Sequence, residues 1–197
     1  MFRCAPMIPN QKEKTKNAIG FFALLHKKKT GKDLPQTFLY KYLAFLDFDS
    51  VQENGEPVLG LEYYARKLGP VPDKIYDYFK SKKEITTDLF VVKNIHKKVY
   101  MIIPTGKEPD LDFFTNWELN KMESLVNVYG NRYNNTKDVI EKSHELITAW
   151  KNTKLNRKIN YKDFKSMFGE DIPSEEEREL SAAENHYLTW LELNGCI

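Results

Sequence analysis

The tetrapeptide Gly69-Pro70-Val71-Pro72 constrains the fold of this chain more than any other stretch of it. Proline fixes its own φ angle, lacks an N–H donor and disfavours α geometry in the residue before it, so Gly69 and Val71 are predicted to be extended. Just upstream, residues 61–66 alternate in character as in a short strand with one face covered. Pro72 suits the first position of a helix. The stretch therefore predicts a rigid strand-to-helix corner, which needs no catalytic explanation.

Helices are predicted on both sides of this corner, together with one β-hairpin. The runs 88–93 and 98–103 are rich in β-branched and aromatic residues, and the short polar segment between them indicates a hairpin. Apolar residues recur at helical spacing in a further set of segments. These segments are 11–28, 35–53, 72–82, 115–130, 136–150 and 160–168.

Two Ser/Thr-x-x-Glu patterns predict where further helices begin. Thr115 with Glu118 fits a capping box, in which a hydroxyl and a carboxylate satisfy the free N–H groups of a helix start. Ser174 with Glu177 fits the same pattern and is predicted to open a C-terminal helix that reaches Leu193. The sequence thus predicts a predominantly α-helical α+β fold with a small antiparallel sheet or hairpin and a winged-helix-like core.

Composition and charge narrow the function classes. With 41% hydrophobic and 29% charged residues the chain is predicted to fold, and a net charge of +2 does not by itself indicate nucleic-acid binding. The charge is uneven: 11–41 carries a net +6 and 170–193 a net −7. These segments are either solvated or mutually neutralising faces, or each docks a partner. We expect one domain over 11–170, with a helical extension over 171–197 packing on it.

The N-terminus lacks the apolar run of a signal peptide, and no stretch approaches the length of a membrane span. The expected location is the cytoplasm, with Cys4 and Cys196 both reduced.

Catalytic chemistry finds little support in the sequence. Ser143, His144 and Glu145 are the residue types of a hydrolase triad, but consecutive side chains on a helix point about 100° apart and cannot converge. The histidines are widely separated, and no Cys/His spacing typical of a metal site occurs. We therefore predict no catalytic residue, no metal, no cofactor and no enzymatic activity.

A winged-helix-like DNA-binding transcription regulator is the alternative. The order 35–53, 72–82 and 88–103 resembles a winged helix, with 72–82 as the recognition helix. Opposite its apolar side, however, lie Asp73 and Asp77, and two carboxylates entering a groove would meet the DNA phosphates. Nucleic acid is therefore not the expected partner, although the alternative stays open.

Several ordered blocks, each weak alone, resemble one known family over about Ile19 to Phe168. They are Leu39-Tyr40-Lys41-Tyr42-Leu43-Ala44 with Asp47, Gly55-Glu56-Pro57-Val58-Leu59-Gly60, Tyr63, Gly69-Pro70-Val71-Pro72 with Tyr76, Ser143-His144-Glu145 with Trp150, and Ile159-Asn160-Tyr161. Together they resemble the Panacea domain, the antitoxin module of the SocA and GepA type found in phage and mobile-element genes.

The resemblance implies a non-enzymatic, protein-binding antitoxin of a toxin–antitoxin system. Members of the family neutralise structurally unrelated toxins by contact, and the SocA relative delivers its toxin to a protease as an adaptor. The implied partners are a cognate protein toxin and, for an adaptor, a protease or its unfoldase. No membrane partner is expected.

The motif residues are interpreted as a scaffold, and the partner contacts are expected on more variable surfaces. The scaffold residues are Tyr42, Gly60, Gly69, Pro70, Val71, Tyr76, His144 and Trp150. Tyr64 and Tyr78, two further aromatics of the corner region, are the predicted partner-binding residues, because exposed tyrosines are frequent hot spots of protein interfaces.

Overall fold

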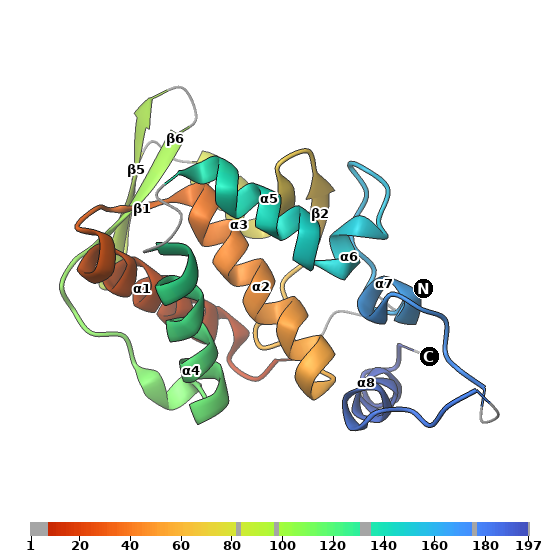
Figure 1. Cartoon of the computed structure of the whole chain (residues 1–197). Coiled ribbons are helices and arrows are strands. Elements are labelled where there is room, and N and C mark those ends of the chain that lie inside the picture. The colour runs from red at the N-terminus through yellow and green to blue at the C-terminus, as the bar shows by residue number, and fades with distance from the viewer. Residues whose placement is uncertain (1–7, 82–83, 97–98, 131–134, 175–176, 197) are drawn as a thin grey trace.

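A computed structural model describes residues 8–81, 84–96, 99–130, 135–174 and 177–196. Its helices surround one central helix, and a small antiparallel sheet projects at one end (Figure 1). This arrangement confirms the predicted α+β fold with predominant helix. The helices are α1 (Gln11–Thr30), α2 (Gln36–Asn54), α3 (Asp73–Ser81), the 3₁₀ turn η1 (Leu111–Phe113), α4 (Asn116–Leu125), the π-helical turn η2 (Val126–Gly130), α5 (Thr136–Leu146), α6 (Thr148–Lys151), α7 (Phe164–Phe168) and α8 (Ala182–Leu193).

The central helix is α2, which is buried on all sides rather than on one stripe. Its buried residues run without a break from Phe38 to Phe48, and they include the charged Lys41 and Asp47. A helix that is apolar all round belongs in the interior of a domain. The helix ends where Gly55 adopts a left-handed conformation with φ 84° and donates its N–H to the carbonyl of Val51.

The main sheet has the strand order β1-β6-β5-β4, all pairs antiparallel. The strands are β1 (Leu34–Pro35), β4 (Glu84–Thr86), β5 (Phe90–His96) and β6 (Val99–Pro104). The β5–β6 pair confirms the predicted hairpin, whereas β1 and β4 were not predicted. Both are only two or three residues long, which is too short to show an alternating pattern. The winged-helix-like character of the core stays a prediction.

The Gly-Pro-Val-Pro stretch forms a strand of its own. β3 (Gly69–Pro72) pairs antiparallel with β2 (Tyr63–Arg66), so the predicted break is half of a second, two-stranded sheet. Pro72 is the last residue of this strand, and α3 begins at Asp73, one residue later than predicted. The corner is extended, as expected, and Gly69 has φ 91°, which an L side chain rarely adopts.

Two predicted helices differ from the observed ones. The segment 136–150 is broken at Ile147, which lies at φ −84°, ψ 95° between α5 and α6. The C-terminal helix opens with a capping box at Ser181 and Glu184, not at Ser174. The capping box at Thr115 and Glu118 is confirmed, with both of its hydrogen bonds present.

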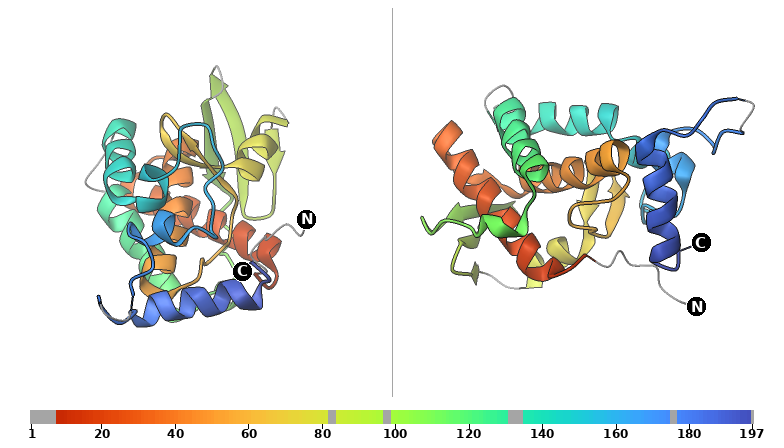
Figure 2. Two further views of the ribbon diagram at one scale, coloured as in Figure 1. Left: turned by 90° about the vertical axis from the view of Figure 1, so that its right-hand side faces the viewer. Right: turned by 90° about the horizontal axis from the view of Figure 1, so that it is seen from below.

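The C-terminal helix α8 packs across the end of α2 (Figure 2). The ring Nδ1 of His186 lies 2.6 Å from the carbonyl oxygen of Asn54, and the buried Tyr187 donates a hydrogen bond to the carbonyl of Tyr161. The division of the chain into a domain and an extension at residue 170 stays a prediction.

Three further expectations concern the cysteines, membrane spans and the two charged segments. Cys196 is disulfide-bonded, so the prediction of a reduced thiol is wrong at this residue, and Cys4 lies outside the described residues. None of the helices in the described part of the chain is long and apolar enough to cross a membrane. Over these same described ranges, no ion pair joins the lysine-rich segment 11–41 to the acidic segment 170–193.

Candidate protein-binding surface

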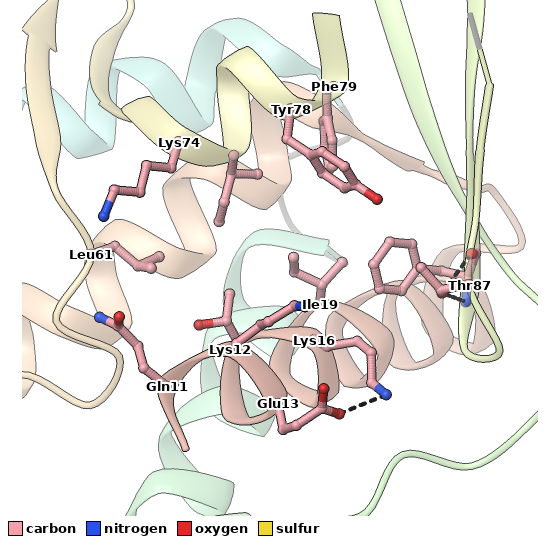
Figure 3. A pocket seen from close by; sticks show the side chains of 13 residues that line it. Gln11, Lys12, Glu13, Lys16, Ile19, Leu61, Lys74, Tyr78, Phe79 and Thr87 are labelled. Atoms are coloured by element: carbon pink, nitrogen blue, oxygen red, sulfur yellow. Dashed lines mark hydrogen bonds and ion pairs between the residues drawn. The ribbon is translucent and has the colours of Figure 1, made fainter. Parts of the chain in front are cut away.

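An apolar groove of about 380 Å³ runs between α1 and α3, and we call it the α1–α3 groove (Figure 3). α1 forms one wall and α3 the other, with Leu61 at one end and Thr87 at the opposite end. The residues that line it are Gln11, Lys12, Glu13, Thr15, Lys16, Ile19, Leu61, Lys74, Ile75, Tyr78, Phe79, Thr87 and Phe90.

The groove has an apolar floor and a charged rim. Ile19, Phe79 and Phe90 belong to the hydrophobic core, so the floor is rigidly packed from behind. Tyr78 stands at the groove with 45% of its surface exposed. A concave apolar surface that carries an exposed aromatic side chain has the composition of an interface centre.

The N-terminal end of α1 is fixed to the turn that precedes β2. The side-chain amide of Gln11 donates to the carbonyl of Leu59 at 2.7 Å and to that of Gly60 at 3.0 Å. A smaller cavity of about 50 Å³ continues the groove past Leu61 toward Gly60 and Pro72. Two backbone acceptors thus fix the start of the α1 wall to the turn at residues 59–60.

Of the two predicted partner-binding tyrosines, only Tyr78 lines this groove. Tyr64 lies on β2, half-buried, where its backbone bridges to Lys158 and the guanidinium of Arg66 lies 5.1 Å from its ring centre. The structure does not bring the two tyrosines together. The sequence left open that the lysine-rich segment 11–41 docks a partner, but no residue of α1 was predicted to be part of a binding surface.

The scaffold motif Gly69-Pro70 meets a buried lysine from α2. The ammonium of Lys41, 1% exposed, donates to the carbonyl of Pro70 at 3.0 Å, and burial lowers the pKa of Lys41 to about 7. A Cβ on Gly69 would lie 2.5 Å from the Ser143 hydroxyl and 2.7 Å from the Lys41 ammonium. Only glycine fits between α2 and α5 at this point.

Ser143 and Lys41 are also the residue types of a Ser–Lys nucleophile pair, but their environment does not suit catalysis. Ser143 is fully buried and donates its hydroxyl proton to the carbonyl of Ile140 at 2.7 Å. A nucleophile needs access to a substrate and an oriented base. The pair therefore acts as packing between α2, α5 and β3.

His144 and Trp150 stack on each other next to this contact, with ring centres 4.0 Å apart and planes 5° from parallel. The indole N–H of Trp150 donates to the carbonyl of Arg66 at 3.0 Å, which ties α6 to the β2 end. Burial, and secondarily the Lys41 cation, lower the pKa of His144. The ring of His144 lies on the tryptophan, while Ser143 donates to Ile140 and Glu145 accepts from Lys142, so these three residues do not form a triad.

The buried carboxylate of Asp47, on α2, binds the backbone of the turn that ends at Gly60. Its carboxylate accepts from the N–H groups of Leu59 at 2.6 Å, Gly60 at 3.2 Å and Leu61 at 3.1 Å, and from the hydroxyl of Tyr63 at 2.9 Å. Burial raises the pKa of Asp47 to about 6, against the effect of these hydrogen bonds. One carboxylate thus fixes the whole turn on which the α1 wall is anchored.

The remaining scaffold residues lie in or against the core. Tyr42 is fully buried, stacks on Phe22 and lies 3.0 Å from the Nδ1 of His26 through its hydroxyl. Tyr76 packs edge-on against Tyr40. Val71 is half-buried on β3. These contacts fit the interpretation as scaffold, which stays a proposal.

Two other kinds of site, a metal site and a DNA-binding surface, gain no support from the described residues. Over these ranges no group of three or more His, Cys, Asp or Glu side chains is placed to hold a metal ion. On the hairpin, Lys93 lies 3.7 Å from Glu84 in an ion pair, and Asp77 is exposed on α3. These two observations give the DNA-binding alternative no support.

Comparison with known proteins gives one family. A family model described as antitoxin SocA-like, Panacea domain, matches residues 39–151, that is, from the first turn of α2 to the end of α6. The match is shorter at both ends than the predicted extent, and α1 and α8 lie outside it. No curated protein and no solved structure matches the chain significantly.

Proposed function

Because the chain belongs to the antitoxin SocA-like, Panacea domain family, we propose that it neutralises a cognate protein toxin by direct contact, without catalysing a reaction. The observation that carries the mode of action is the α1–α3 groove, an apolar surface with an exposed tyrosine. The toxin covers this surface, and the antitoxin in turn covers the toxin's functional surface.

The buried polar groups support a scaffold role for the motif residues. Lys41, Asp47 and Ser143 all make hydrogen bonds inside the protein, and each is at most 1% exposed. Such groups fix the backbone of the corner and the turn, and they leave recognition to the side chains of the surface.

The test is neutralisation by purified components. The chain is mixed with the purified product of the neighbouring gene, tested first for toxicity when expressed alone, and toxin activity and complex formation are measured without any protease present. We expect a stable complex and loss of toxin activity in proportion to the antitoxin added. Neutralisation that occurs only in cells that contain a particular protease would contradict the direct mode and favour an adaptor.

Two single variants separate the predicted contact residues. Tyr78→Ala removes the aromatic side chain of the groove and is expected to weaken toxin binding by about 2 kcal/mol, or roughly 30-fold. Tyr64→Ala is the test of the second predicted position, and Val128→Ala, 43% exposed on η2, is the control. Unchanged binding by both tyrosine variants would disprove this surface assignment.

A further inference from the structure

Lysine side chains stand on both rims of the α1–α3 groove, and their positive charge indicates the chemistry of its ligand. Lys12 and Lys16 extend from α1 and Lys74 from α3, so cationic side chains rim both long walls (Figure 3). The acidic Glu13 lies 2.7 Å from the ammonium of Lys16, which is also 3.6 Å from Asp88. Lys12 and Lys74, by contrast, are exposed and make no ion pair with any residue in the described ranges.

The polar groups of the floor are few. Besides Ile19, Ile75, Phe79 and Phe90, which are apolar, the groove contains the hydroxyl of Thr15, which is buried and has no hydrogen-bond partner among the described residues. An unsatisfied buried hydroxyl carries a desolvation cost of about 1–3 kcal/mol, which a bound carbonyl or amide would relieve.

This arrangement suits a peptide segment better than a small molecule. Small-molecule sites combine an apolar cavity with several polar groups that converge on the ligand. Here the charges stand on the two opposite rims, and the long axis lies between two helices. An amphipathic segment laid between them would place apolar side chains on the floor and carboxylates beside the lysines.

We propose that the α1–α3 groove binds an amphipathic segment of the toxin whose apolar face is flanked by acidic residues. This inference rests on the proposed antitoxin function and goes further, because it names the recognised chemistry. Tyr78 covers the apolar face, and Lys12 and Lys74 pair with carboxylates on its two sides. The complementary charges steer the encounter and fix the orientation of the segment.

The test reverses the two unpaired lysines in the full chain. The double variant Lys12→Glu/Lys74→Glu is expected to weaken binding of the purified toxin at least tenfold at low salt, and to reduce the salt dependence of the affinity. The matched control is Lys28→Glu/Lys80→Glu, which reverses one lysine on each of the same helices outside the groove lining. Thermal unfolding checks that both double variants stay folded.

A second measurement identifies the bound segment. Hydrogen exchange of the complex is expected to protect residues 11–19 and 74–79 of the antitoxin and one acidic, amphipathic segment of the toxin. Replacing the carboxylates of that segment by lysine should restore binding to the Lys12→Glu/Lys74→Glu variant.

The outcomes separate the two proposals. If the wild type neutralises the toxin and both double variants bind it equally well, the groove inference is wrong and the antitoxin function stands. If the wild type forms no complex with the toxin, both proposals fail. A small molecule found in the groove by native mass spectrometry, or a homodimer that the Lys12→Glu/Lys74→Glu variant dissociates, would also overturn the inference.

Discussion

Asp47 connects two sequence blocks that look independent along the chain. It lies on α2, whereas its acceptor bonds reach the backbone of the turn 59–61 and the hydroxyl of Tyr63. In the sequence, Asp47 stood out only as one residue of a block that resembles the family. The sequence could not identify the partners of Asp47, because three of the four are backbone N–H groups, which leave no pattern in the sequence.

Replacing Asp47 by alanine should strongly reduce the stability of the protein. It leaves the N–H groups of the turn unpaired in the interior, and we expect a loss of about 4 kcal/mol in the free energy of unfolding. Asp47→Asn keeps one acceptor and should lose less. Urea unfolding measures both, with Asp49→Ala as the control on the same helix.

Asp49 makes a partly exposed ion pair with Lys121 at 2.8 Å, so its replacement should cost about 1 kcal/mol or less. Equal losses of stability for Asp47→Ala and Asp49→Ala would show that the buried hydrogen bonds of Asp47 contribute no more than a partly exposed ion pair.

At the scale of elements, a capping pattern marked a helix start only where the residues that follow it also pack against the domain. Ser174 with Glu177 and Ser181 with Glu184 spell the same capping pattern, and the first pair does make the hydrogen bond from the Ser174 N–H to the Glu177 carboxylate at 2.8 Å. The helix nevertheless begins after Ser181, because the residues that bury themselves against the domain, Tyr187 among them, lie beyond it.

The break at Ile147 has a similar cause. A continuous helix over 136–150 would satisfy the apolar spacing, but Ile147 is buried at the break and the indole of Trp150 is fixed to the carbonyl of Arg66. The geometry of β2, which is distant in sequence, thus decides where α5 ends. Periodicity within one segment contains no information of this kind.

The docking of α8 should depend on Gly55. A Cβ at this position would lie 2.5 Å from the carbonyl oxygen of Ala183 and 2.7 Å from the backbone nitrogen of Tyr187, which cannot move without shifting α8. Gly55→Ala is expected to destabilise the protein by several kcal/mol and to raise hydrogen exchange in 182–193.

Gly31→Ala is the matched control. Gly31 ends α1 in the same left-handed conformation, with φ 73°, but nothing lies within 4 Å of its Cβ position. Its replacement should cost only the conformational strain of about 1–2 kcal/mol and leave α8 protected. If both variants behave alike, close packing of α8 is not what requires glycine at residue 55.

At the scale of the whole molecule, the groove could not be predicted from the sequence. Tyr78 was named because exposed tyrosines are frequent hot spots of protein interfaces. Lys12 and Lys16 belong to a helix some sixty residues away, and the sequence gives no distance between that helix and α3. The resemblance to the family supplied the function class, but it concerns residues that turned out to lie mostly in the interior.

Stability should depend on pH through two buried groups that oppose each other. In the folded protein burial lowers the pKa of His26 from 6.5 to about 4 and raises that of Asp47 from 3.8 to about 6. Between pH 4 and 6 the unfolded chain holds a proton on His26 and the folded protein holds one on Asp47. The two contributions to the pH dependence of unfolding therefore nearly cancel in this window.

The variant His26→Gln removes the histidine contribution to this pH dependence. A depressed histidine pKa means that the wild type loses stability as the pH falls from 6.5 to 4, whereas the variant lacks this loss. The stability deficit of the variant relative to the wild type should therefore shrink by about 3 kcal/mol over that range. Urea unfolding at pH 4.5, 5.5 and 7 measures it, and a deficit that is constant with pH would contradict the assignment to His26.

The attachment of α1 to the turn before β2 has a consequence for how such proteins diversify. α3 lies inside the segment that the family model matches, whereas α1 (Gln11–Thr30) lies outside it. The side chain of Gln11 binds backbone carbonyl groups, so this contact does not depend on the side chains of the residues that it binds. Under the proposed function, the exposed residues of α1 can therefore change with the toxin, whereas its buried face, with Ile19 and Phe22, must keep packing on the core. Evolution of a new target would then need substitutions only on the outward side of one helix, with no change to the interior of the domain.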